Sequence, residues 1–215
     1  MPDGNRRFAK KNNISFSEAY NFGAKTLKLF SDFFVSEGVS NMLIYHAMSD
    51  YTHQRTDLTL EPIYDAITEC FRELYESNFF IKRKIKFKTI DHSKAVPERL
   101  KNISKRLEDS TNSNSKEVVV LLGYSLEEDY NCALSKNPKN YNELRKWLLF
   151  PDIDLVIRPK EMRPSKGPVY AMGQSQMITL DKLNPEVEEN DLSKILEECS
   201  LWKGYRERNN PFHKQ

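Results

Sequence analysis

The segment PDGNRR, near the start of the chain, places one carboxylate, a side-chain amide and two guanidiniums around a glycine. Gly4 lets backbone N–H groups approach an anion, and a helix that follows would turn its positive end toward that anion. Arg6 and Arg7 offer forked donors that match phosphate oxygens. Asp3 could hold a magnesium ion that bridges such oxygens. The plain alternative for this segment is a charged terminus in contact with water.

A second polar segment, RPKEMRPS, follows an apolar run that ends in IDLVI. Arg158 stands at the end of that run, and Arg163 and Ser165 follow in the loop. A buried charge is costly without a partner, so Arg158 needs an anion, either a ligand or a nearby acid such as Glu161. Arg55 occupies a third polar loop, where an exposed surface residue is the plain interpretation.

The histidines and the absence of common catalytic motifs limit the reactions that the protein could catalyse. His46 lies within an apolar run and is expected to be a core residue with satisfied hydrogen bonds, whereas His53 stands in a loop where it could touch a ligand. The sequence contains no HExxH, GxSxG, GxxxxGK or GxGxxG motif. Arginines in three segments, with one acid and no evident nucleophile, indicate a diphosphate ligand that itself leaves. The protein would supply electrostatics and an apolar pocket.

These residues must be positioned by alternating strands and helices. Ser15 and Glu18 have capping-box spacing at the start of a first helix, which is expected to end near Gly38. The run VVVLLGY is typical of a strand buried on both faces of a parallel sheet. The pattern predicts an α/β fold with a central, mostly parallel sheet flanked by helices, and ligands bind at the carboxyl ends of such strands. The expected strands are 42–48, 84–90, 118–124, 153–159 and 177–183, and the further helices are 63–74, 96–107, 126–134, 141–149 and 192–202.

Composition limits the remaining possibilities. The 215 residues, 39% of them hydrophobic, suffice for one domain over 1–215, with a polar tail from about residue 205. A formal net charge of +2 argues against general nucleic-acid binding. Cys70, Cys132 and Cys199 are unevenly spaced, which fits free thiols in a reducing compartment. Neither a transmembrane run nor a signal peptide is evident, so we expect a cytoplasmic protein without stable membrane insertion.

Four segments together resemble the cis-prenyltransferase family, to which undecaprenyl diphosphate synthase belongs. PDGNRRFAKK resembles the opening MDGNGRWAK, and MLIYHAMSDYTHQR is similar to LYAFSSENWNR. VVVLLGYS resembles a strand ending in NYG, and PDIDLVIRPKEMRPS resembles PDLLIRTSGEQRLS. The order and spacing hold from residue 1 to about 208. The resemblance implies a homodimer of α/β subunits that bind prenyl diphosphates, with a hydrophobic tunnel between two helices and the sheet.

The resemblance also implies roles for single residues. Asp3 matches the catalytic aspartate that binds magnesium diphosphate, so Mg²⁺ is the expected cofactor. The other matches are Gly4, Asn5 and Arg7 for the cradle of the allylic diphosphate, with Arg6 beside them, Ser49 and Arg55 for the serine and arginine of SSENWNR, and Arg158, Arg163 and Ser165 for the clamp of the second diphosphate.

Several positions depart from the family's pattern. Arg6 replaces the second glycine of MDGNG, and Thr52 replaces the asparagine of SSENW. Phe16 and Tyr20 replace an arginine and a histidine of the first helix, so they cannot hold phosphate as charges. The late glutamate that supports magnesium aligns with Gln176, whose neutral amide is a poorer ligand for a hard cation. We also expect the family's first strand to be missing or shortened.

The opening PDGNRRF is closer to one branch of the family than to MDGNGRW. That branch, of the lavandulyl and cyclolavandulyl diphosphate synthase type, makes branched or cyclic short prenyl diphosphates. The resemblance implies a transferase that joins two dimethylallyl diphosphates head to middle, with or without cyclisation, and releases diphosphate. Three alternatives stay open: regular cis elongation with isopentenyl diphosphate, a terpene cyclase, and a catalytically degenerate partner subunit that binds prenyl diphosphate.

Overall fold

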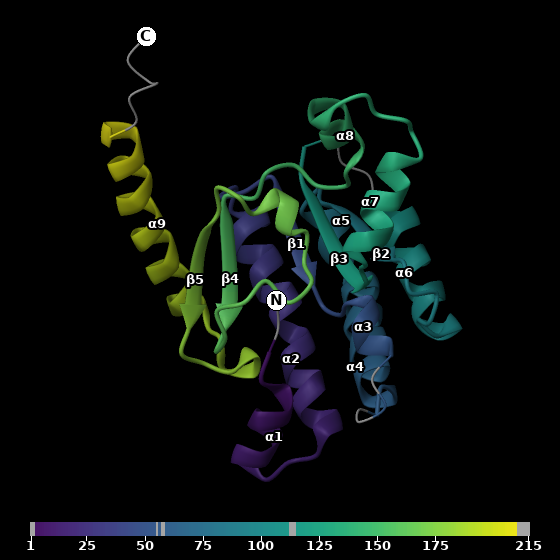
Figure 1. Cartoon of the computed structure of the whole chain (residues 1–215). Coiled ribbons are helices and arrows are strands. Elements are labelled where there is room, and N and C mark those ends of the chain that lie inside the picture. The colour runs from purple at the N-terminus through teal and green to yellow at the C-terminus, as the bar shows by residue number, and fades with distance from the viewer. Residues whose placement is uncertain (1–2, 55, 57–58, 112–114, 210–215) are drawn as a thin grey trace.

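The computed structural model describes residues 3–54, 56, 59–111 and 115–209. Its strands form two parallel sheets, one with the order β1-β3-β2 and one made of β4 and β5 (Figure 1). The expected α/β class is confirmed, but the expected single sheet is divided. Ile157 of β4 and Ile178 of β5 pack on the same core as the first sheet, so apolar contacts hold the two sheets together. The strands are β1 (Met42–His46), β2 (Lys86–Asp91), β3 (Glu117–Gly123), β4 (Leu155–Pro159) and β5 (Gln176–Leu180).

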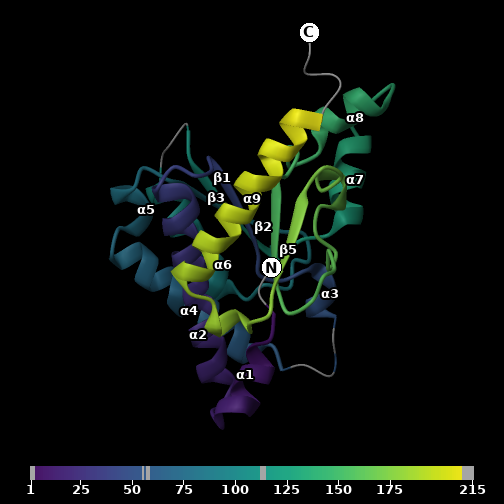
Figure 2. The ribbon, with the colours of Figure 1, turned by 90° about the vertical axis from the view of Figure 1, so that its left-hand side faces the viewer.

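Three of the helices, α2, α4 and α6, pack side by side and supply much of the main core. Their buried side chains, such as Leu27, Phe71 and Leu100, meet those of β3, such as Val120. Figure 2 shows α9 along the outer side of β5, which it contacts. The α-helices are α1 (Asn5–Asn12), α2 (Phe16–Phe30), α3 (Asp50–His53), α4 (Glu61–Glu76), α5 (Phe79–Lys82), α6 (Glu98–Ser110), α7 (Leu126–Leu134), α8 (Tyr141–Trp147) and α9 (Glu189–Asn209).

The capping box predicted for α2 is present. The Ser15 hydroxyl accepts from the Glu18 N–H at 3.1 Å, and the Glu18 carboxylate accepts from the Ser15 N–H at 2.9 Å. These bonds lower the pKa of the Glu18 carboxyl. The helix continues as a π-helical segment, Ser31–Ser36, up to Gly38, whose φ of 78° ends it. The local sequence signals at both ends of this long helix therefore determine its length.

Helix α1 is not predicted by the sequence pattern, because NRRFAKKN is mostly charged and offers Phe8 and Ala9 as its apolar residues. Gly4 makes the helix possible. Its φ is 94°, and a Cβ at this position would lie 2.6 Å from the Leu183 side chain, so both the turn and the close packing require glycine. Helix α1 is thereby pressed against the chain that follows β5.

Two expectations about the rest of the chain can be compared with the structure. Cys70, Cys132 and Cys199 are free thiols, as expected. Within the part of the chain that the structure describes, no helix is both long and apolar enough to cross a membrane.

Candidate active site

Asp3 is held at the carboxyl end of the β4–β5 sheet by its backbone. The N–H of Asn184, in the short helix that follows β5, donates to the Asp3 carbonyl oxygen at 2.8 Å. Gly4 then turns the chain into α1, and its own carbonyl oxygen accepts from the Phe8 N–H. The Asp3 carboxylate therefore stands directly before the positive end of α1, where anions are favoured.

Arg158 reaches the same place from the carboxyl end of β4. Its side chain is 3% exposed, and its Nη2 lies 3.9 Å from Oδ2 of Asp3. Its Nε donates to the carbonyl oxygen of Glu161 at 3.1 Å. Burial lowers the pKa of the Arg158 guanidinium. A buried guanidinium whose nearest carboxylate oxygen lies beyond hydrogen-bond distance is suited to receive a further anion.

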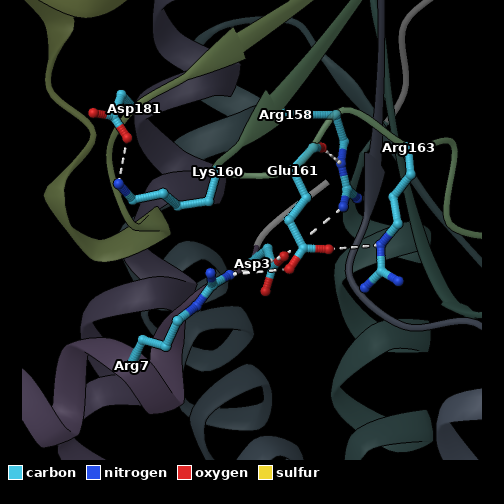
Figure 3. Close-up of polar contacts among 7 residues, drawn as sticks. All are labelled: Asp3, Arg7, Arg158, Lys160, Glu161, Arg163 and Asp181. Atoms are coloured by element: carbon cyan, nitrogen blue, oxygen red, sulfur yellow. Dashed lines mark hydrogen bonds and ion pairs between the residues drawn. The ribbon is translucent and has the colours of Figure 1, made fainter.

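A charged cluster surrounds this pair (Figure 3). Arg7 on α1 approaches Asp3 Oδ2 at 3.2 Å and Glu161 Oε1 at 3.5 Å through the same nitrogen, Nη2. The Nε of Arg163 lies 2.8 Å from Glu161 Oε2. The sequence suggested Glu161 as an acid partner of Arg158, but its carboxylate pairs with Arg7 and Arg163 instead, and only its carbonyl oxygen meets Arg158.

The loop after β4 bends sharply. Lys160, Ser165 and Lys166 all have positive φ, at 64°, 43° and 57°, a conformation that is uncommon outside glycine and concentrates at functional sites. The hydroxyl of Ser165 is buried and has no hydrogen-bond partner among the described residues. Lys160 turns away from the cluster and pairs with Asp181. This loop thus presents Arg163 and an unused hydroxyl next to the end of β4.

A cavity of about 690 Å³ opens beside the cluster. One end is polar and carries Asp3 and the α1 side chains. The other end is mostly apolar and lies among α2, α4 and β1. The lining residues are Asp3, Gly4, Asn5, Arg6, Arg7, Lys10, Phe16, Tyr20, Gly23, Ala24, Tyr45, Ala47, Met48, Thr52, Ile63, Ala66, Ile67, Glu161 and Arg163.

The cavity thus unites most of the residues that the sequence singled out near the N-terminus, and it adds Lys10. That lysine stands four positions after Arg6 and so on the same face of α1. The sequence missed it because α1 itself was not predicted. Phe16 and Tyr20, where the family has charged side chains, also line the cavity, so its wall is aromatic at those positions.

The loop after β1 is only partly associated with the cavity. Thr52 lines it, and the Ser49 hydroxyl lies 3.2 Å from the Thr52 hydroxyl. Ser49 itself is not among the lining residues and reaches the site through Thr52. Arg55 lies outside the described residues.

Gln176, which matches the family's magnesium-supporting glutamate, lies at the other end of the β4–β5 sheet from the charged cluster within this chain. Gln176 pairs with Leu155 at the amino end of the β4–β5 sheet, whereas Arg158 pairs with Thr179 near the carboxyl end. Three residues along a strand span ~10 Å. The resemblance gives the residue type at this position but not the register of the two strands.

The expectation for His53 is corrected, and that for His46 is confirmed in its burial but not in its hydrogen bonding. The Nε2 of His53 bonds the Leu122 carbonyl oxygen at 2.6 Å and its Nδ1 bonds the Tyr64 hydroxyl at 2.6 Å, so both nitrogens serve the fold rather than a ligand. His46 is buried as expected, but its Nδ1 has no hydrogen-bond partner among the described residues. Burial lowers the pKa of His46 to about 3, so the ring is neutral.

The residues present fit a magnesium ion that is held mainly by the phosphate oxygens of a bound diphosphate. Oδ2 of Asp3 is buried and accepts no hydrogen bond from the described residues, although it is ion-paired with Arg7 at 3.2 Å, and a carboxylate oxygen is the donor that Mg²⁺ prefers. Within the described ranges, no group of three or more His, Cys, Asp and Glu side chains could hold a metal. Magnesium commonly needs only one or two carboxylates when phosphate oxygens complete its shell.

A cationic rim at the carboxyl ends of parallel strands, with an acid at its centre and an apolar cavity beside it, defines a class of protein that binds a diphosphate carrying an apolar tail. Residues 1–208 match the profile of the family described as "Prenyltransf: Putative undecaprenyl diphosphate synthase". The chain belongs to this prenyltransferase family and is a cis-prenyltransferase by the names of its relatives.

Two curated relatives and one solved structure illustrate the match. The tritrans,polycis-undecaprenyl-diphosphate synthase (geranylgeranyl-diphosphate specific) of Pyrobaculum aerophilum is 27% identical, over 93% of this chain and 90% of the relative. The isoprenyl transferase of Fusobacterium nucleatum is 28% identical, over 91% and 88%. The fold is similar to that of lavandulyl diphosphate synthase from Lavandula x intermedia in complex with dimethylallyl diphosphate, with a TM-score of 0.80, 21% identity and 92% of each chain covered.

Proposed function

We propose that this protein joins two dimethylallyl diphosphates into a ten-carbon prenyl diphosphate and releases diphosphate. The bond between C1 and the diphosphate oxygen of the donor breaks, and its electron pair leaves with the diphosphate. The double bond of the acceptor forms the new carbon–carbon bond, and the acceptor skeleton then loses a proton. Such a reaction needs stabilisation of the departing charge and an apolar space for the two short chains.

The charged cluster supports this assignment of roles. Arg7, Arg6 and Asn5, at the positive end of α1, would hold the leaving diphosphate, and Arg158 and Arg163 would hold the diphosphate of the acceptor. Asp3 would hold the magnesium ion, which when bound supplies positive charge against the departing diphosphate.

The depth of the cavity supports a short product. We take this cavity to be the hydrophobic tunnel of the family. Its wall along α2 runs from Phe16 to Ala24, which is ~12 Å of helix. Ala24 is the last residue of α2 that lines it. The Cys70 thiol on α4 donates to the Ala24 carbonyl oxygen at 3.4 Å, and Leu27 and Phe71, which belong to the same apolar core, are 2% and 0% exposed.

This depth suits two or three prenyl units, at ~4–5 Å for each extended unit. The eleven units of an undecaprenyl chain would extend for ~50 Å. The proposed product is therefore much shorter than that named for the archaeal relatives.

Regular cis elongation with isopentenyl diphosphate is the second candidate, and the names of the curated relatives favour it. The lavandulyl diphosphate synthase fold and the PDGNRRF opening favour the irregular coupling. Incubation with dimethylallyl diphosphate alone, isopentenyl diphosphate alone, and both together separates the two. Diphosphate release from dimethylallyl diphosphate alone supports the proposal, and release only from the mixture supports elongation.

We also propose that the protein is a homodimer, as the resemblance implies, and that it is cytoplasmic, as its composition indicates. Light scattering of the purified protein tests the first, and fractionation of expressing cells tests the second.

A further inference from the structure

The carboxylate of Glu161 lies between the two arginines that would receive the two diphosphates (Figure 3). Its Oε2 is 2.8 Å from Arg163 Nε, and its Oε1 is 3.5 Å from Arg7 Nη2. We propose that Glu161 is a specificity-determining residue that makes the site select metal-bound diphosphate over free diphosphate. The inference rests on the proposed function, because it assumes that this cluster binds diphosphate.

Glu161 is placed there by the backbone of the loop. Its N–H donates to the Pro159 carbonyl oxygen at 2.9 Å, and its carbonyl oxygen accepts from the Arg163 N–H at 3.0 Å. The same carbonyl oxygen accepts from the Arg158 Nε. Glu161 therefore contacts three arginines from two regions of the chain, and its carboxylate lines the cavity with a side chain that is 39% exposed.

The charges explain the effect on binding. Three guanidiniums, those of Arg7, Arg158 and Arg163, face the two carboxylates of Asp3 and Glu161. A metal-free diphosphate must compete with Glu161 for Arg7 and Arg163 and then remain next to a negative charge. A diphosphate that carries Mg²⁺ has a smaller net negative charge, so its repulsion by Glu161 is weaker.

A purely structural role for Glu161 predicts the opposite sign. If the carboxylate only held Arg7 and Arg163 in place, its removal would loosen both arginines and weaken the binding of every diphosphate. If it acts as proposed, its removal frees the arginines and strengthens the binding of metal-free diphosphate. The sign of one affinity change therefore distinguishes the two roles.

The test is calorimetric titration of inorganic pyrophosphate into the full chain, once with EDTA and once with Mg²⁺. Glu161→Gln keeps the side-chain shape and removes the charge. Asp181→Asn is the matched control, because Asp181 pairs with Lys160 in the same region and does not line the cavity. We expect Glu161→Gln to tighten binding in EDTA about tenfold, which is the scale of one charge a few ångströms away. Its enhancement by Mg²⁺ should shrink by a similar factor, and Asp181→Asn should stay within about twofold of the wild type.

Weaker or unchanged binding of pyrophosphate by Glu161→Gln in EDTA would overturn the inference. A change of equal size in Asp181→Asn would also overturn it, because the effect would then be one of general charge. Wild-type protein that fails to bind pyrophosphate in either buffer would instead contradict the proposed function itself. Thermal unfolding of each variant shows whether the fold is retained.

Discussion

Asp3 and Arg158, which are 155 positions apart in the sequence, place a carboxylate oxygen and a guanidinium nitrogen 3.9 Å apart. Asp3 is fixed by the Asn184 N–H, and Arg158 by the end of β4 and the Glu161 carbonyl oxygen. Neither side chain is neutralised by a close hydrogen bond to the other. Asp3 is paired instead with Arg7 at 3.2 Å, so the guanidinium of Arg158 stays available for an anionic ligand.

Replacing Asp3 tests its assigned role at the metal. Asp3→Asn keeps the size of the side chain but removes the charge that would hold Mg²⁺. We expect the rate of diphosphate release to fall by about 10²–10³-fold, with a melting temperature close to that of the wild type, because Asp3 is held by its backbone. Steady-state rates and thermal melts measure both. A variant with more than a third of the wild-type rate would remove Asp3 from the reaction.

Arg158 should contribute to binding at a cost in stability. Its guanidinium is 3% exposed and has no carboxylate within hydrogen-bond distance among the described contacts. Burying such a charge is unfavourable. Arg158→Met should leave the free energy of unfolding unchanged or higher, while the affinity for magnesium pyrophosphate falls at least about tenfold. Urea unfolding and calorimetry give the two quantities. A loss of ~3 kcal/mol in stability would show that Arg158 is mainly structural.

The contact between Cys70 and Ala24 should limit the length of the donor. Cys70→Ala combined with Leu27→Ala opens space behind Ala24, at a cost of ~2–5 kcal/mol for the buried leucine. We expect the double variant to accept a twenty-carbon allylic diphosphate, whose four units exceed the cavity depth of the wild type. Leu74→Ala, which also removes a buried leucine, controls for the loss of stability. Equal use of the longer donor by wild type and double variant would place the end of the cavity elsewhere.

His46 should make stability depend on pH. Its pKa of about 3 in the folded chain lies below the ordinary value of 6.5, so the unfolded chain takes up a proton first as the pH falls. The stabilisation is complete above pH 6.5 and is lost progressively below it. Between pH 6.5 and 5.0 this group should cost ~2 kcal/mol. Urea unfolding of wild type and His46→Leu at both pH values isolates the difference, and an equal pH response in both proteins would exclude His46 as its source.

The sequence was sufficient for those parts of the fold that local signals specify. The capping box at Ser15 favours a helix start and the apolar run of β3 favours a buried strand, and both are found where expected. Arg158 was identified as a site residue because a charge at the end of a buried strand has few explanations. The sequence pattern does not predict helix α1, because its residues are mostly charged and its close packing involves Gly4 and Leu183, which are distant in sequence.

Long-range geometry also explains the errors within the site. Gln176 was matched by alignment, but the register of β4 against β5 places it at the opposite end of the sheet. The sequence predicts a loop at His53, where its side chain could touch a ligand, but its partners, Tyr64 and Leu122, come from two other elements. The sequence offers Glu161 as an acid partner of Arg158, but its pairing with Arg7 depends on the packing of α1 against the loop after β4.

The size of the product tests the central claim most directly. Wild-type protein is incubated with Mg²⁺, dimethylallyl diphosphate and isopentenyl diphosphate. The products are treated with phosphatase, and the masses of the resulting alcohols are measured by mass spectrometry. A cavity that ends at Ala24 and Cys70 predicts ten-carbon alcohols as the main product, formed also when isopentenyl diphosphate is omitted. A ladder of products that extends to fifty-five carbons would contradict this account of the site.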